Sequence, residues 1–135
     1  MKKHLLIALC LLGTMFGTMT SCSSSKTNEP QEGAEIYAAI SGDGNTLTLY
    51  FDAKREKRNG VTDWSIYSNS KSAPNWETNH VKRIVLDKTM TLAQPTSTNA
   101  WFQEFCHAEK IEHLDYLNTS QVTDMSRMFN LCYKL

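Results

Sequence analysis

The sequence predicts an α+β fold, in which a small, mostly antiparallel β cap is followed by the start of a strand-and-helix solenoid. Two observations carry this prediction. Between residues 35 and 94, apolar and polar side chains alternate at the two-residue period of half-buried strands. Towards the C-terminal end, a short extended stretch gives way to apolar residues at helical spacing, which is typical of one strand-plus-helix repeat unit.

The first 21 residues form a predicted secretory signal. Two lysines precede an apolar run over residues 5–12, which is too short for a stable membrane span. Cys22 follows Met19-Thr20-Ser21, which resembles the lipobox of bacterial lipoproteins, with Met where leucine is more usual. The resemblance implies cleavage before Cys22 and attachment of lipid to its thiol. The alternative is ordinary cleavage that leaves Cys22 as a free thiol.

Residues 22–34 form a predicted flexible tether. The stretch is rich in serine, glutamate and other polar residues and carries no large apolar side chain. Because it has nothing to bury, it cannot offset the entropy lost on ordering. Its expected role is to hold the folded part away from the bilayer.

The cap, residues 35–94, is predicted to be a sheet. Alternating apolar residues over 36–40 and 47–51 flank the turn-forming run Ser41-Gly42-Asp43-Gly44-Asn45, which indicates a hairpin. A third strand is expected over residues 61–67 and a further one over 81–87, where Ile84-Val85-Leu86 indicates burial on both faces. The three tryptophans are expected to be core or cap residues: Trp64, Trp76 and Trp101.

Residues 114–135 carry the pattern of a repeat unit. Leu114 and Leu117 fit an extended segment, and Asn118-Thr119-Ser120 favours a turn. A helix is then predicted over residues 122–132, with Asp124 in its first turn. Its apolar face would consist of Val122, Met125, Met128, Phe129 and Cys132.

This run resembles the repeat of BspA-like bacterial surface lipoproteins, a leucine-rich-repeat family of mostly unassigned ligand. The similarity rests on the core Thr119-Ser120-Gln121-Val122-Thr123-Asp124-Met125-Ser126-Arg127-Met128-Phe129 and extends upstream to residues 95–102. Phe105 stands where the family usually has cysteine, and Ala108 where it has leucine. The resemblance implies that residues 95–135 begin a leucine-rich-repeat array that residues 35–94 cap. Since Leu135 falls at an apolar core position of the repeat, the array is expected to be truncated.

A charged cluster, Lys54-Arg55-Glu56-Lys57-Arg58, admits two interpretations. It could bind nucleic acid or an anionic glycan, or it could be a solvated hairpin tip. The formal net charge of the chain is zero, and removal of Lys2 and Lys3 with the signal makes it slightly negative. A solvated tip is the better interpretation, and no nucleic-acid partner is expected.

The cysteines that remain after processing are Cys106 and Cys132. They could form a disulfide in an oxidising compartment, but the preferred prediction is a pair of buried, reduced thiols in the repeat core. A metal site made by Cys106, His107, Glu109 and His113 matches no standard zinc spacing, so no metal is expected.

The sequence lacks a serine nucleophile elbow, a glycine-rich phosphate loop and a His-Glu-x-x-His pattern. Carboxylates such as Asp115 and Asp124 have structural roles in turns and at the helix start. The prediction is therefore a cofactor-free, non-enzymatic lipoprotein of a bacterial envelope, anchored at the outer membrane or cell surface through lipid on Cys22. Its repeats would bind a host or bacterial protein or glycan, with adhesion implied by the resemblance. The alternatives are a truncated remnant without binding activity and, behind both, a small hydrolase.

Overall fold

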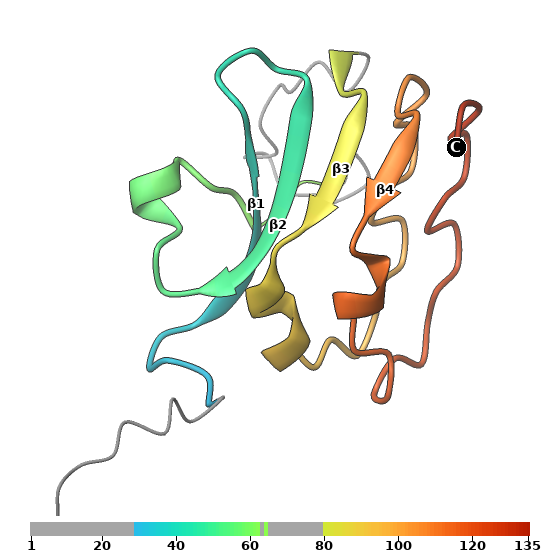
Figure 1. The fold of residues 1–135 in the computed structure, drawn as a ribbon. Helices are drawn as coiled ribbons and strands as arrows, with labels where there is room; N and C mark the ends of the chain where they lie inside the picture. The colour runs from blue at the N-terminus through green and yellow to red at the C-terminus, as the bar shows by residue number, and fades with distance from the viewer. Residues whose placement is uncertain (1–28, 63, 65–79) are drawn as a thin grey trace, which may run out of the picture.

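The computed structural model describes residues 29–62, 64 and 80–135. These residues form a small α+β-type domain with one four-stranded sheet in the order β1-β2-β3-β4, and its helices are short 3-10 helices (Figure 1). The strands are β1 (Glu35–Ile40), β2 (Thr46–Asp52), β3 (Arg83–Leu86) and β4 (Lys110–Glu112). The 3-10 helices are η1 (Glu56–Arg58), η3 (Lys88–Leu92) and η4 (Leu114–Tyr116).

The predicted hairpin is confirmed. β1 and β2 pair antiparallel from Glu35 opposite Asp52 to Ile40 opposite Leu47. In the connection, the Asp43 carboxylate accepts hydrogen bonds from the Ser41 hydroxyl and from the amide of Asn45. These bonds and a second one from the Asn45 side chain lower the pKa of Asp43 to about 2. Local turn chemistry therefore fixes the register that the alternation of apolar residues suggested.

The sheet is mixed, so the prediction of a mostly antiparallel sheet is wrong. β3 pairs parallel with β2, and β4 pairs parallel with β3. Antiparallel neighbours can be joined by a tight turn, whereas parallel neighbours need a long crossover. Both of the later connections in this chain are long, and each returns the strand to the same end of the sheet (Figure 1).

The predicted helix over residues 122–132 is wrong. The described backbone there is a series of turns. In these turns an amide donates to the carbonyl three residues earlier, as Met128 N does to Met125 O and Cys132 N to Phe129 O. Arg127 and Leu131 adopt left-handed φ values of 57° and 63°, which an α-helix does not tolerate. Of the predicted apolar face, Met128 is buried, whereas Met125 and Phe129 are exposed.

Two strand assignments also change. Leu114 begins a 3-10 helix, η4, that Leu117 directly follows, and the strand of this region lies earlier, at β4. Val61 forms a single antiparallel bridge with Ala38, while residues 63 and 65–67 of the predicted third strand lie outside the described residues. The predicted strand over 81–87 is confirmed as β3, but the predicted burial on both faces is not: Ile84 and Leu86 are buried, whereas Val85 on the opposite face is only half-buried. Trp64 is buried, Trp101 is half-buried against the core, and Trp76 lies outside the described residues.

Inward-facing side chains of β2 and β3 form the centre of the core, and the segment that follows η3 closes it. Buried residues that precede and follow β3 in the chain complete this core. The largest fully buried apolar side chains are Leu47, Leu49, Val81, Ile84, Leu86, Met90, Phe102 and Phe105.

Two stretches of the chain lie side by side in parallel register, the first window (residues 82–108) and the second window (residues 109–135) (Figure 1). Arg83 of β3 pairs with Lys110 of β4, and Ser97 forms a parallel bridge with Asp124; contacts between the windows join residues 27 apart. Over residues 98–104, every second amide of the first window donates to a carbonyl of the second at 2.9–3.0 Å; the pairs are Thr98 and Asp124, Ala100 and Ser126, Phe102 and Met128, and Glu104 and Asn130.

Candidate functional site

The solvent side of the sheet is the first candidate site. Strand residues alternate between faces, so the residues between the buried positions of β2 and β3 point away from the core. Pairing then places them in two rows, Thr46 beside Arg83 beside Lys110, and Thr48 beside Val85 beside Glu112. We call these six residues the outer sheet face.

The charges of the outer sheet face are arranged around one carboxylate. Lys110 Nζ lies 2.6 Å from Glu112 Oε1, and Arg83 Nη1 lies 3.8 Å from the same oxygen. The hydrogen bond from Lys110, aided by Arg83, holds the pKa of Glu112 below its ordinary value. Two cations share one anion on an exposed surface, so the face retains positive charge that an incoming acidic group could use.

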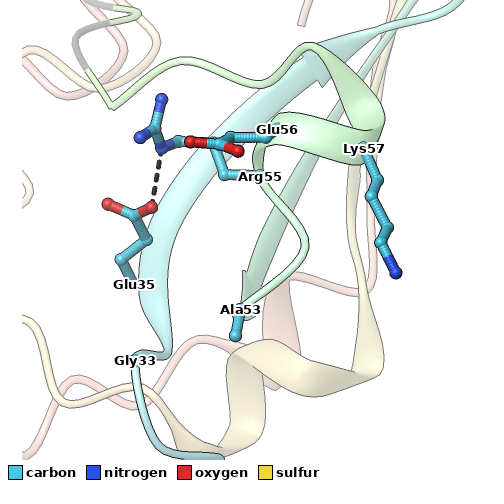
Figure 2. A pocket seen from close by; sticks show the side chains of 6 residues that line it. All are labelled: Gly33, Glu35, Ala53, Arg55, Glu56 and Lys57. Carbon is cyan, nitrogen blue, oxygen red and sulfur yellow. Dashed lines mark hydrogen bonds and ion pairs between the residues drawn. The ribbon is translucent and has the colours of Figure 1, made fainter.

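A hollow of about 190 Å³ lies near the start of β1, lined by Gly33, Glu35, Ala53, Arg55, Glu56 and Lys57 (Figure 2). Arg55 Nε donates to Glu35 Oε1 at 2.6 Å across one side of it. Both partners are more than one-third exposed. The hollow is open, its Arg55 and Glu35 charges already pair with each other, and its lining offers no serine, cysteine or histidine, so it does not have the form of a catalytic pocket.

A polar network lies beneath η1. The hydroxyl of Tyr37 donates to Asp52 Oδ1 at 2.7 Å, and Arg58 Nη1 contacts the Tyr37 hydroxyl and both Asp52 oxygens, the nearer at 2.8 Å. The Arg58 guanidinium lies 4.1 Å from the centre of the Tyr50 ring, which stacks on Tyr37. Gly60 completes the packing, because a Cβ there would lie 2.3 Å from the Tyr37 ring.

The pKa values of this network follow from its geometry. Burial is the largest influence on Tyr37, and with the Asp52 carboxylate beside it the pKa of Tyr37 rises to about 12. Burial opposes ionisation of Asp52, but hydrogen bonds from Tyr37, Arg58 and the Lys54 amide outweigh it and keep its pKa below the ordinary value. Asp52 and Tyr37 are shielded from solvent and fully hydrogen-bonded, so the network stabilises the hairpin and is not arranged to act on a substrate.

The interpretation of the charged cluster as a solvated tip needs correction for two of its members. Arg55 pairs with Glu35, and Arg58 is part of the Tyr37–Asp52 network, while Lys54, Glu56 and Lys57 are exposed. Sequence analysis missed this network. Its signal was an aromatic and a carboxylate on the non-core positions of the hairpin, followed by an arginine in the next turn.

The other predicted site residues are placed as follows. Cys106 and Cys132 are half-buried free thiols, and Cys132 Sγ donates to the carbonyl of Phe102 at 2.9 Å. Burial raises the pKa of Cys132. No group of three or more His, Cys, Asp or Glu side chains among the described residues is placed to hold a metal ion. Cys22 lies outside the described residues.

Comparison with known proteins returned no match. No family model matches the chain, and no curated protein or solved structure is significantly similar to it. Within the part of the chain that the structure describes, no helix has the length and apolar character needed to cross a bilayer.

Proposed function

We propose that the chain is a lipid-anchored protein of a bacterial envelope whose folded part is a repeat-built binding module for protein or glycan. The observation that carries this proposal is the parallel register of the two windows, whose contacts join residues 27 apart. Stacked units of one length are the hallmark of repeat proteins, which bind through surfaces assembled from equivalent positions in successive units.

Backbone conformation supports the repeat interpretation independently of the pairing. Ala100 and Arg127 have φ values of 55° and 57°, and Glu104 and Leu131 have φ values of 65° and 63°. Left-handed φ is uncommon outside glycine, so its recurrence at equivalent positions of both windows indicates one local structure used twice. In this proposal the two windows are successive units of a leucine-rich-repeat-like stack, and the β1–β2 hairpin caps it.

The outer sheet face is the proposed binding surface. Each unit contributes one residue to each row of the outer sheet face. Arg83 and Lys110 are therefore equivalent, as are Val85 and Glu112. Surface ion pairs of this kind contribute little to stability, so their side chains can be changed without loss of the fold. The excess positive charge favours a ligand with carboxylate, sulfate or sialic acid groups.

The binding proposal predicts that Arg83→Glu combined with Lys110→Glu lowers adhesion at least about tenfold, because the changes reverse the charge of the row that would meet an acidic ligand. The measurement is binding of the purified protein to a panel of immobilised extracellular-matrix proteins and sialylated or sulfated glycans. Lys54→Glu combined with Lys57→Glu makes the same change in net charge on exposed residues elsewhere. Wild-type protein that binds no member of the panel, or equal binding by both double variants, contradicts the proposal.

The anchor has its own test. Residues 29–33 are exposed, in keeping with the proposed tether. Cys22→Ala is expected to move the protein from the membrane fraction to the soluble fraction, since two or three acyl chains anchor a protein durably at about 0.8 kcal/mol per buried methylene. Mass spectrometry of the wild-type protein should find acylated Cys22 at the mature N-terminus. An unmodified wild-type protein in the soluble fraction would refute the anchor.

A further inference from the structure

The second window exposes apolar surface that the first window does not. All large apolar side chains that are exposed among the described residues belong to it: Leu114, Met125, Phe129, Leu131, Tyr133 and Leu135. The C-terminal segment that carries most of them runs along the edge of the fold beyond β4, on the side away from β1 (Figure 1). Such a concentration of apolar side chains at one end marks a contact surface.

Three of the six equivalent positions in the first window are buried, those of Thr98, Phe102 and Ala108. Phe102 is fully buried and stacks on Phe129, with ring centroids 5.6 Å apart, whereas Phe129 itself is 42% exposed. Thr98 is likewise fully buried, and its equivalent Met125 is 49% exposed. At these two positions the second window therefore exposes side chains where the first window is covered.

The backbone amides at four equivalent positions of the two windows also differ in whether they are paired. In the first window the amides of Thr98, Ala100, Phe102 and Glu104 donate to carbonyls of the second window. Their equivalents in the second window donate no hydrogen bond within the described part of the chain: the amides of Met125, Arg127, Phe129 and Leu131. Unpaired amides along an edge are a template for another chain, and they need carbonyl acceptors.

We infer that these four amides and six apolar side chains, the terminal face, dock a polypeptide segment that has the same residue pattern as residues 109–135. The segment lies parallel to residues 123–131, accepts a hydrogen bond at every second carbonyl, and covers Phe129 with an aromatic or aliphatic side chain. This continues the contact that already joins the two windows. The inference rests on the repeat stacking of the proposed function but not on its adhesive role.

A second folded copy of the chain is a poor occupant. Two terminal faces brought together would oppose amide donors to amide donors. The carbonyls that could accept from them, those of Asp124, Ser126, Met128 and Asn130, already accept bonds from the first window of their own molecule. An unfolded segment that carries the repeat pattern has its carbonyls available, which is the situation in strand addition to an open edge.

The test uses the purified full chain and a synthetic peptide of residues 109–135, with binding followed by isothermal titration calorimetry. Saturable one-to-one binding is expected, and a peptide of the same composition in scrambled order should not bind. Phe129→Asp should weaken binding at least about tenfold, because it places a charge where the apolar contact forms. Gln121→Asp is the matched control, since Gln121 is exposed in the same window but outside the terminal face.

A second pair of variants tests the amides separately. Met125→Pro removes one donor of the terminal face, while Met125→Ala shortens the same side chain and keeps the donor. Weaker binding by Met125→Pro than by Met125→Ala is expected. Equal binding of the native and scrambled peptides, no binding, or a stable dimer of the full chain on sedimentation overturns the inference. Equal adhesion by the Arg83/Lys110 and Lys54/Lys57 double variants, with intact peptide binding, would instead refute only the adhesive role.

Discussion

Phe102→Ala is expected to lower the free energy of unfolding by about 3–5 kcal/mol, the usual cost of removing a large aromatic side chain from a core. The ring is fully buried, stacks on Phe129 and meets Trp101 edge-on. Its backbone also donates to Met128 and accepts from the Cys132 thiol. Phe102 therefore joins the sheet core to the second window, and a cavity there weakens both.

Phe129→Ala is the matched control for this measurement. The same side chain is removed at the equivalent position of the second window, where the ring is 42% exposed. We expect a loss of about 1 kcal/mol, because only part of the transfer free energy of a buried aromatic is involved. Urea titration of both variants, followed by tryptophan fluorescence, measures the difference. Equal losses would mean that the second window is covered in the folded protein and that the terminal face is not open.

The parts of the fold that depend on local chemistry could be predicted from the sequence. The hairpin follows from alternating residues on either side of a Gly/Asp turn, and Asp43 closes that turn with its own side chain. The Ile84-Val85-Leu86 run marked β3 for the same reason. In both cases the residues that determine the element lie within a few positions of one another.

Pairing between distant segments could not be predicted in this way. Nothing local indicates that β3 enters beside β2 in the parallel sense, since that depends on the path of the connection. The turns over residues 122–132 were mistaken for a helix because both structures space apolar residues by three or four. Left-handed residues such as Arg127 and Leu131 distinguish the two, and neither is a residue type that signals this conformation.

The candidate sites show the same difference between local pattern and long-range pairing. Pattern alone proposed Cys22 as a lipid attachment point, and it recognised residues 54–58 as a charged cluster. It could not separate Arg58, which reaches back to Asp52, from Lys57, which remains in solvent. The rows of the outer sheet face became visible only with the strand register, because Arg83 and Lys110 are far apart in sequence and adjacent in space.

Asp52→Asn is expected to lower the free energy of unfolding by about 2–3 kcal/mol, somewhat less than the loss of a partner from a fully buried ion pair because Arg58 is partly exposed. The change leaves the Arg58 guanidinium and the Tyr37 hydroxyl facing an uncharged amide beneath η1. Glu35→Gln is the matched control, since it neutralises an exposed carboxylate that pairs with Arg55 on the same hairpin. It should shift the urea midpoint far less.

The same variant should change how stability depends on pH. The folded-state pKa of Asp52 is lowered, so its contribution to stability is complete above the ordinary carboxyl pKa and is lost as the pH falls through the lowered value. Asp52→Asn removes that part of the acid dependence. Asp43, which has a pKa of about 2, retains its own.

At alkaline pH the sign is opposite. The pKa of Tyr37 is raised from 10 to about 12, so its contribution is complete below pH 10 and is lost as the pH rises towards 12. Asp52→Asn replaces a charged hydrogen-bond acceptor, which helps to raise this pKa, with a neutral amide, while Arg58, which lowers it, stays. Tyrosinate absorbance at 295 nm should therefore show one tyrosine ionising at lower pH in the variant than in the wild-type protein. Superimposable titration curves, together with unchanged stability, would mean that Tyr37, Asp52 and Arg58 do not act as one network.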